Sequence, residues 1–207
     1  MTTGDPARLV VLHGLRVKGF ADVPAVAELS GLDESAVAEH LDALSAAGLV
    51  AHRNGLVGGW HLTPAGRVEH ATALAEAAPD ELALAQVRAG YERFADLDPV
   101  VKGVCTAWQV RDLDAGVIND HRDAAYDAEV VERLGAVHVE ALAVVDALAQ
   151  ALVRLGPYRR RLDTAYRRVR AGDGDAFTKP LSGSYHDVWM ELHEDLLVTL
   201  GLERSGS

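Results

Sequence analysis

The sequence predicts a mainly α-helical protein of two domains with one small β-hairpin near its start. Apolar residues recur at helical spacing through most of the 207 residues. Two short apolar runs flank Asn54-Gly55, a dipeptide typical of tight hairpin turns. Aromatic residues divide unevenly, because Phe20 and Trp60 are the two that precede residue 76 and nine follow it. We therefore place the boundary near residue 78 and expect domains 1–78 and 79–207.

The first domain is expected to contain three helices, a hairpin and a fourth helix. Asp33 is a suitable N-cap for the third helix, which runs to about Ala47 with Val37, Leu41 and Leu44 on its inner side. The other expected elements are helices around residues 9–17 and 23–30, a turn at 30–32, strands at 49–53 and 60–62, and a helix that starts at Thr63-Pro64. This order predicts an N-terminal winged helix-turn-helix with a small β-hairpin wing.

The composition is that of an ordinary soluble globular protein, with 49% hydrophobic and 25% charged residues. The one cysteine, Cys105, cannot form an internal disulfide, which fits a reducing compartment. We see no secretory signal and no uncharged apolar run near the roughly 18 residues of a membrane span. We therefore expect a cytoplasmic protein that does not enter a membrane. The net charge of −11 argues against non-specific coating of nucleic acid.

Two segments of the first domain carry a family resemblance. Residues 26–50, VAELSGLDESAVAEHLDALSAAGLV, resemble the helix-turn-helix of MarR-like bacterial transcriptional regulators. Residues 62–67, LTPAGR, resemble the segment that follows the wing in the same family. The resemblance covers about residues 7–75. It implies a regulator that binds a double-stranded DNA operator, which we expect to act as a homodimer.

The candidate DNA contacts follow from this fold. Ser35 and His40 lie on the outward side of the third helix near the expected base edges, and Arg53 would reach the minor groove or a phosphate. The remaining candidates, in the wing turn or near the phosphates, are Arg16, Lys18, Asn54 and Arg67. The charge of this domain argues against DNA binding, because residues 1–75 carry five basic and eight acidic side chains. The alternative is a winged helix that contacts protein instead of DNA.

The second domain is expected to be an α-helical sensor or dimerisation domain. Its helical patterns cover residues 82–94, 100–110, 128–154, 158–170 and 184–200, and residues 172–180 form a polar loop. Cys105 falls on an apolar stripe with Val101, Val104 and Trp108, so we interpret it as a core residue, with a redox sensor as the alternative. The arginines of 159–161 and 167–170 are interpreted as a solvated face that pairs with acidic helices, or else as an anion- or partner-docking surface.

A ligand pocket between these helices is a further hypothesis. Trp108, Tyr126 and Trp189 would form its walls, and the polar contacts would be Arg111, His121, His186 and His193. The alternative is that the histidines simply hydrogen-bond to acids on neighbouring helices. His186 and His193 are two helical turns apart, roughly 10 Å, so they cannot both bind one ion unaided. We expect no metal and no cofactor.

A second resemblance concerns residues 119–127, NDHRDAAYD, and 184–196, SYHDVWMELHEDL. They resemble a helical segment associated with phosphoenolpyruvate-utilising, pyruvate-phosphate-dikinase-like proteins, over about residues 88–203. It implies a link to a phosphotransfer enzyme as partner, and so an alternative function as an interaction protein that regulates such an enzyme. No nucleophile elbow and no glycine-rich phosphate loop are present, so we expect no catalysis. A metal- or haem-binding protein is the third interpretation.

Overall fold

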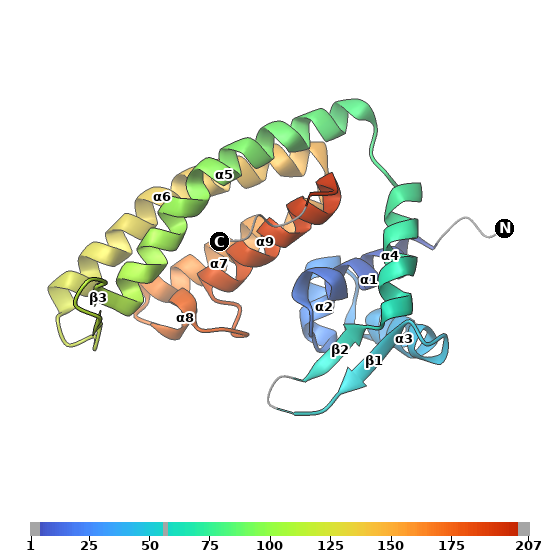
Figure 1. The fold of residues 1–207 in the computed structure, drawn as a ribbon, viewed down its shortest axis with the longest axis horizontal. Helices are drawn as coiled ribbons and strands as arrows, with labels where there is room; N and C mark the ends of the chain where they lie inside the picture. Colours follow the sequence, from blue (N-terminus) through green and yellow to red (C-terminus); the bar gives the residue numbers. More distant parts are fainter. Residues whose placement is uncertain (1–4, 56–57, 203–207) are drawn as a thin grey trace. The chain divides into compact units, whose positions relative to one another are not determined.

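Helices make up 72% of the structure, a computed structural model that describes residues 5–55 and 58–202. The described strands form small two-stranded antiparallel sheets, so the mainly α fold class is confirmed. The chain divides into two units, Met1–Asp80 and Glu81–Ser207, which places the boundary two residues after the predicted position. Figure 1 shows the elements of each unit.

The first unit contains helices and one hairpin in the expected order. Its elements are α1 (Pro6–Lys18), α2 (Val23–Ser30), α3 (Glu34–Ala46), β1 (Val50–Arg53), β2 (Gly59–Leu62) and α4 (Pro64–Glu76). Each of these helices starts behind a side-chain cap, because Asp5, Asp22, Asp33 and Thr63 accept hydrogen bonds from backbone N–H groups of the first turn. These local signals are the reason that the sequence pattern located the helices to within a few residues.

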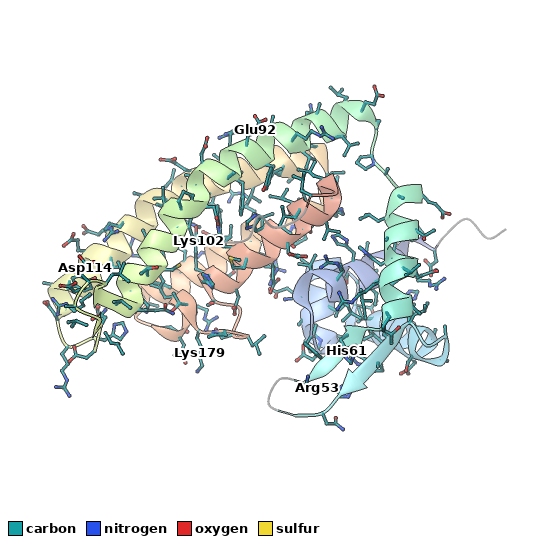
Figure 2. All side chains as sticks on the ribbon, viewed as in Figure 1. Arg53, His61, Glu92, Lys102, Asp114 and Lys179 are labelled. Carbon is teal, nitrogen blue, oxygen red and sulfur yellow. The ribbon has the colours of Figure 1, made fainter. Side chains whose placement is uncertain are left out.

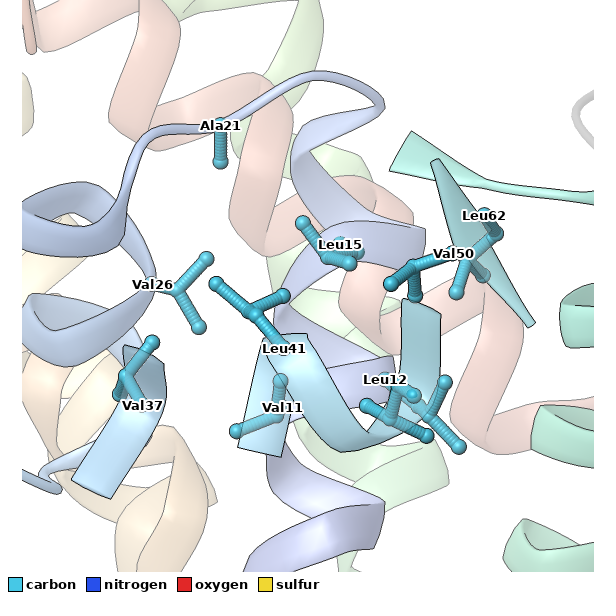
Figure 3. Close-up of a cluster of buried hydrophobic side chains, with 10 residues drawn as sticks. Val11, Leu12, Leu15, Ala21, Val26, Val37, Leu41, Val50 and Leu62 are labelled. Atoms are coloured by element: carbon cyan, nitrogen blue, oxygen red, sulfur yellow. The ribbon is translucent and has the colours of Figure 1, made fainter. Parts of the chain in front are cut away.

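The core of the first unit is one cluster formed by α1, α2, α3 and both strands (Figure 3). Val11, Val26, Val37 and Leu41 are each 0% exposed. The hairpin closes over this cluster with Val50 opposite Leu62. Gly66 lies where α4 approaches the segment between α3 and β1, and a Cβ there would lie 1.9 Å from the carbonyl oxygen of Leu49. The absence of a side chain at residue 66 therefore allows α4 to pack at this position.

The second unit is built on four long helices. Its elements are α5 (Glu81–Gln109), β3 (Val110–Asp112), β4 (Val117–Ile118), α6 (Ala124–Ala151), the 3₁₀ turn η1 (Val153–Leu155), α7 (Pro157–Arg170), α8 (Asp175–Thr178) and α9 (Tyr185–Leu200). Helix α5 contacts α6 and α9, and α7 contacts the same two helices, so the four surround a common core. Trp189, Tyr158, Tyr185, Phe94 and Phe177 are its largest buried side chains.

The start of this unit differs from the prediction. Helix α5 is continuous through Pro99, whereas the sequence suggested separate helices at 82–94 and 100–110. It begins at Glu81, one residue before the predicted start. Phe94 and Val101 are both completely buried and lie seven residues apart, so one apolar side continues past the proline. This packing outweighs the backbone hydrogen bond that a proline removes. The β3–β4 hairpin was not predicted.

Helix α6 is the one described helix whose length and composition would suffice to cross a membrane. Of its most apolar window, 39% is buried inside the structure. Val130, Leu134, Val145 and Leu148 are all at most 1% exposed, and the helix packs against α5 and α7. Its apolar residues are thus those of a helix that contributes to the core of this unit.

Candidate functional site

The exposed side of α3 is acidic. Val37, Leu41 and Leu44 face the core, as predicted, and Glu34, Glu39 and Asp42 are exposed. The hydroxyl of Ser35 donates to Oδ1 of Asp33 at 2.7 Å. Nδ1 of His40 lies 3.8 Å from a carboxylate oxygen of Asp5, and the His40 side chain is 26% exposed. Both predicted base-reading residues therefore have an acidic neighbour within the protein.

The predicted phosphate contacts come from three different elements. Arg16 and Lys18 are half-buried in the last turn of α1. Arg53 is exposed at the end of β1, with its guanidinium 5.4 Å from the centre of the Phe20 ring, and Figure 2 shows it on the hairpin. Asn54 follows it in the exposed turn, and Arg67 is exposed near the start of α4. Residue 53 is therefore a basic group on the hairpin that a polyanion could reach.

A cavity of about 610 Å³ lies in the second unit beside α8. It is lined by the end of α5, the segment before α6, the first turn of α6 and the loop around α8. Its lining residues are Trp108, Gln109, His121, Asp127, Gly172, Asp173, Gly174, Asp175, Thr178, Lys179 and Pro180. Figure 2 shows Lys179 beside α8. The volume lies within the usual range of small-molecule sites.

Asn119 organises the polar side of this cavity. It is only 4% exposed, and its amide nitrogen donates to the carbonyl oxygen of Trp108 at 3.0 Å and to Oδ1 of Asp127 at 2.8 Å. Its Oδ1 accepts from the backbone N–H of His121 at 3.2 Å. Nδ1 of His121 lies 3.1 Å from Oδ2 of Asp127. A histidine–aspartate pair is thus held in place by a buried amide.

His121 adopts a left-handed backbone conformation with φ of 57°. For a residue other than glycine such a conformation costs about 1 to 3 kcal/mol, and strain of this kind concentrates at functional sites. Its ring lies 4.5 Å from the ring of Trp108, centre to centre. The other near neighbour of Trp108 is Phe177, stacked on it at 4.6 Å. The imidazole is therefore held by the aromatic contact as well as by the hydrogen bonds.

Two of the predicted ligand contacts lie next to the cavity without lining it. The guanidinium of Arg111 donates to Asp123 at 2.8 Å and stacks 4.5 Å from the ring centre of Tyr126. The hydroxyl of Tyr126 donates to the carbonyl oxygen of Ala107 at 2.9 Å. Asp123 also caps α6, and the backbone N–H of Tyr126 in that cap lowers the pKa of this carboxyl, followed by the guanidinium of Arg111. These residues brace the segment that carries His121.

The other predicted ligand contacts lie on α9, and the single pocket walled by both tryptophans is not observed. Trp189 is 0% exposed, stacks on Phe94 at 4.2 Å, and donates its indole N–H to Asp98 at 3.0 Å. His193 packs 5.1 Å from Phe94, ring to ring. His186 is half-buried on the same helix. The face of α9 that looked suitable for a pocket is filled by α5, so Trp189 and His193 contribute to the core packing.

Burial alone would raise the pKa of Asp98, but Lys102 and the indole of Trp189 lower it below its usual value. His193 acts in the same direction. His193 on α9 therefore interacts electrostatically with Asp98 on α5.

Most of the arginines of α7 face acidic side chains. Arg161 pairs with Glu191 at 2.7 Å, Arg159 with Asp146 at 2.7 Å and Arg168 with Asp173 at 2.8 Å. Arg167 pairs with Asp163 one turn away. The predicted pairing with acidic residues is thus observed for these four, but Arg161 is only 3% exposed and does not belong to a solvated face. Within the described ranges, no group of three or more His, Cys, Asp or Glu side chains is placed to hold a metal ion.

Sequence reasoning missed most of the cavity. Of its lining, it singled out Trp108 and His121 as ligand contacts and assigned residues 172–180 to a plain polar loop. Asn119 and Asp127 belong to the segment 119–127, which the sequence analysis singled out for another reason. An amide, a histidine and an aspartate close together in this segment could have indicated a polar site. The lining residues at 172–180 could not be predicted, because they are far from residue 121 along the chain and only the fold brings them together.

Comparison with family models, with curated proteins and with solved structures finds no match.

Proposed function

We propose that this chain is a cytoplasmic, dimeric transcriptional regulator. Its first unit acts as a winged helix-turn-helix that binds an operator in double-stranded DNA, and its second unit dimerises and binds a small effector. The observation that supports this proposal most is the α2–turn–α3 arrangement followed by the β1–β2 hairpin. Gly31, with φ of 74°, makes the tight turn, and Asp33 caps α3 directly after it. In regulators with this order, the second helix enters the major groove.

The acidic surface of α3 determines what kind of binding is expected. Glu34, Glu39 and Asp42 would repel phosphates, so non-specific affinity should be low. Arg53 and Arg67 are exposed and would supply contacts to the backbone, and a dimer would double them. We therefore expect binding that is selective for one operator and sensitive to salt.

The experiment is a fluorescence-anisotropy titration of the full chain, at about 50 mM salt where electrostatic binding is strong. The probes are the DNA upstream of its own gene and duplexes enriched by the protein from a random pool. Arg53→Ala should weaken binding about tenfold. Arg122→Ala removes the same charge from the second unit, where the side chain is 89% exposed, and should leave affinity unchanged. Failure to enrich any duplex, with the protein folded, refutes the proposal.

A second candidate is an interaction protein that regulates a phosphoenolpyruvate-utilising enzyme, and the acidic face of α3 favours it. Such a face suits a basic protein surface better than a phosphate backbone. Glu39→Gln separates the two functions. It should strengthen DNA binding if α3 lies in the groove, and weaken capture of the enzyme if α3 is the protein contact.

A further inference from the structure

The cavity beside α8 presents an acceptor atom that the protein does not use. The amide nitrogen of Asn119 lies 3.2 Å from Nδ1 of His121, but its two hydrogens are used in the shorter contacts to Trp108 at 3.0 Å and Asp127 at 2.8 Å. A carboxylate oxygen can only accept. The hydrogen between Nδ1 of His121 and Oδ2 of Asp127 therefore belongs to the imidazole. In the neutral ring this leaves Nε2 with a lone pair, and in the part of the chain that the structure describes no group donates to it. The His121 side chain is 43% exposed and lines the cavity.

The charge around this acceptor favours a cation. Asp127, Asp173 and Asp175 all line the cavity, and Lys179 is the one lysine or arginine among the lining residues. The ammonium of Lys179 pairs with Asp175 one turn away, and Arg168 pairs with Asp173. The carboxylate of Asp127 accepts from Asn119 and His121, and no lysine or arginine of the lining pairs with it. A donor at Nε2 would therefore also interact with a negative charge directly behind the ring.

The rest of the lining is suited to an apolar body. The edge of the Trp108 indole borders the cavity, and Pro180 lies in the same lining. Gly174 leaves this edge open, because a Cβ there would lie only 3.4 Å from Cζ2 of Trp108. A ligand that combines one ammonium group with a small ring or short hydrocarbon matches both sides of the cavity.

We propose that this cavity binds a small organic amine in its ammonium form, which donates to Nε2 of His121 and rests its apolar part against Trp108. The inference deepens the effector role of the second unit and rests on the proposed function for its regulatory meaning. Binding itself requires neither DNA nor a dimer.

The test is isothermal titration calorimetry of the full chain with three probes of one shape. Tyramine carries an ammonium, 4-ethylphenol is neutral, and 4-hydroxyphenylacetate carries a carboxylate. Tyramine should bind at least about tenfold more tightly than the other two, the usual scale of a hydrogen bond to a charged group. Equal or tighter binding of the neutral or anionic probe overturns the proposal, as does a complete absence of tyramine binding.

Two variants place the binding in this cavity. His121→Asn removes the acceptor ring and keeps a residue that tolerates the left-handed backbone, so the fold should persist. It should reduce tyramine affinity about tenfold, and Asp127→Asn should do the same. Asp120→Asn removes a carboxylate from the same segment outside the cavity lining and should change nothing. Full tyramine affinity in folded His121→Asn contradicts the assignment.

The calorimetric titration with tyramine and the anisotropy titration with DNA test the two proposals separately. If tyramine binds but no DNA duplex is enriched, the amine site stands and the regulatory function is refuted. If a DNA operator binds but tyramine does not, DNA binding stands and the amine site is refuted.

Discussion

The hydroxyl of Tyr158 donates to Oδ2 of Asp195 at 3.0 Å, and the two residues are 0% and 1% exposed. Arg154 pairs with the other oxygen of this carboxylate. Burial and the charges of Asp195 and Glu191 raise the pKa of Tyr158 well above its usual value, so the hydroxyl keeps its proton and remains a donor. α7 and α9 are therefore joined through a polar contact inside an apolar core.

Tyr158→Phe should destabilise the second unit by about 1 to 3 kcal/mol, because a buried carboxylate loses a donor and keeps its desolvation cost. Urea unfolding followed by circular dichroism measures the change. Tyr91→Phe is the matched control, since its ring packs 6.4 Å from Phe94 and lies outside this polar contact. Equal midpoints for Tyr158→Phe and the unmodified protein would show that the hydrogen bond contributes nothing.

Gly66→Ala should destabilise the first unit by about 3 kcal/mol or more, because the new methyl group would collide with backbone and not with a movable side chain. Gly103→Ala is the matched control. Gly103 is exposed within α5 and a Cβ there meets nothing within 4 Å, so helix propensity should stabilise the protein by about 1 kcal/mol. Thermal unfolding of both variants tests this, and a neutral Gly66→Ala would contradict the close approach of α4.

The thiol of Cys105 should be unreactive in the folded protein. It is 5% exposed, and burial raises its pKa to about 12, so almost no thiolate is present at neutral pH. A disulfide reagent such as Ellman's should react fully in concentrated guanidinium chloride and negligibly in native buffer. Rapid labelling of the native protein would revive the redox-sensor alternative.

Acidification should weaken the second unit through His138. The residue is 4% exposed on α6, stacked on Tyr166 at 4.3 Å, and burial lowers its pKa below 6.5 although Asp163 opposes this. Below pH 6.5 the histidine therefore binds a proton more readily in the unfolded chain than in the folded one. The free energy of unfolding should decrease as the pH is lowered. Urea midpoints at successive pH values test this. His138→Gln should make the urea midpoint less dependent on pH below 6.5. An unchanged dependence would show that other groups cause it.

The sequence predicted most helix boundaries because caps and breaks are local. Asp33 and Ser184 accept hydrogen bonds from N–H groups of the turn that each begins. The long helix α6 ends at Ala151, three residues before the predicted end, and begins at Ala124, four residues before the predicted start. The gap predicted between residues 94 and 100 is absent, since a local pattern cannot weigh the burial of Phe94 and Val101 in the core of the unit.

The sequence by itself determined which residues face a core, because apolar spacing along one helix does not depend on what covers it. Val37, Leu41 and Leu44 on α3, and Val101, Val104 and Cys105 on α5, are all buried as their spacing predicts. Only the tertiary structure decided whether an aromatic side chain lines a cavity or fills a core. Trp108 borders open volume because the loop at 172–180 returns beside it, whereas α5 covers Trp189. Such contacts join residues far apart along the chain, and no local spacing encodes them.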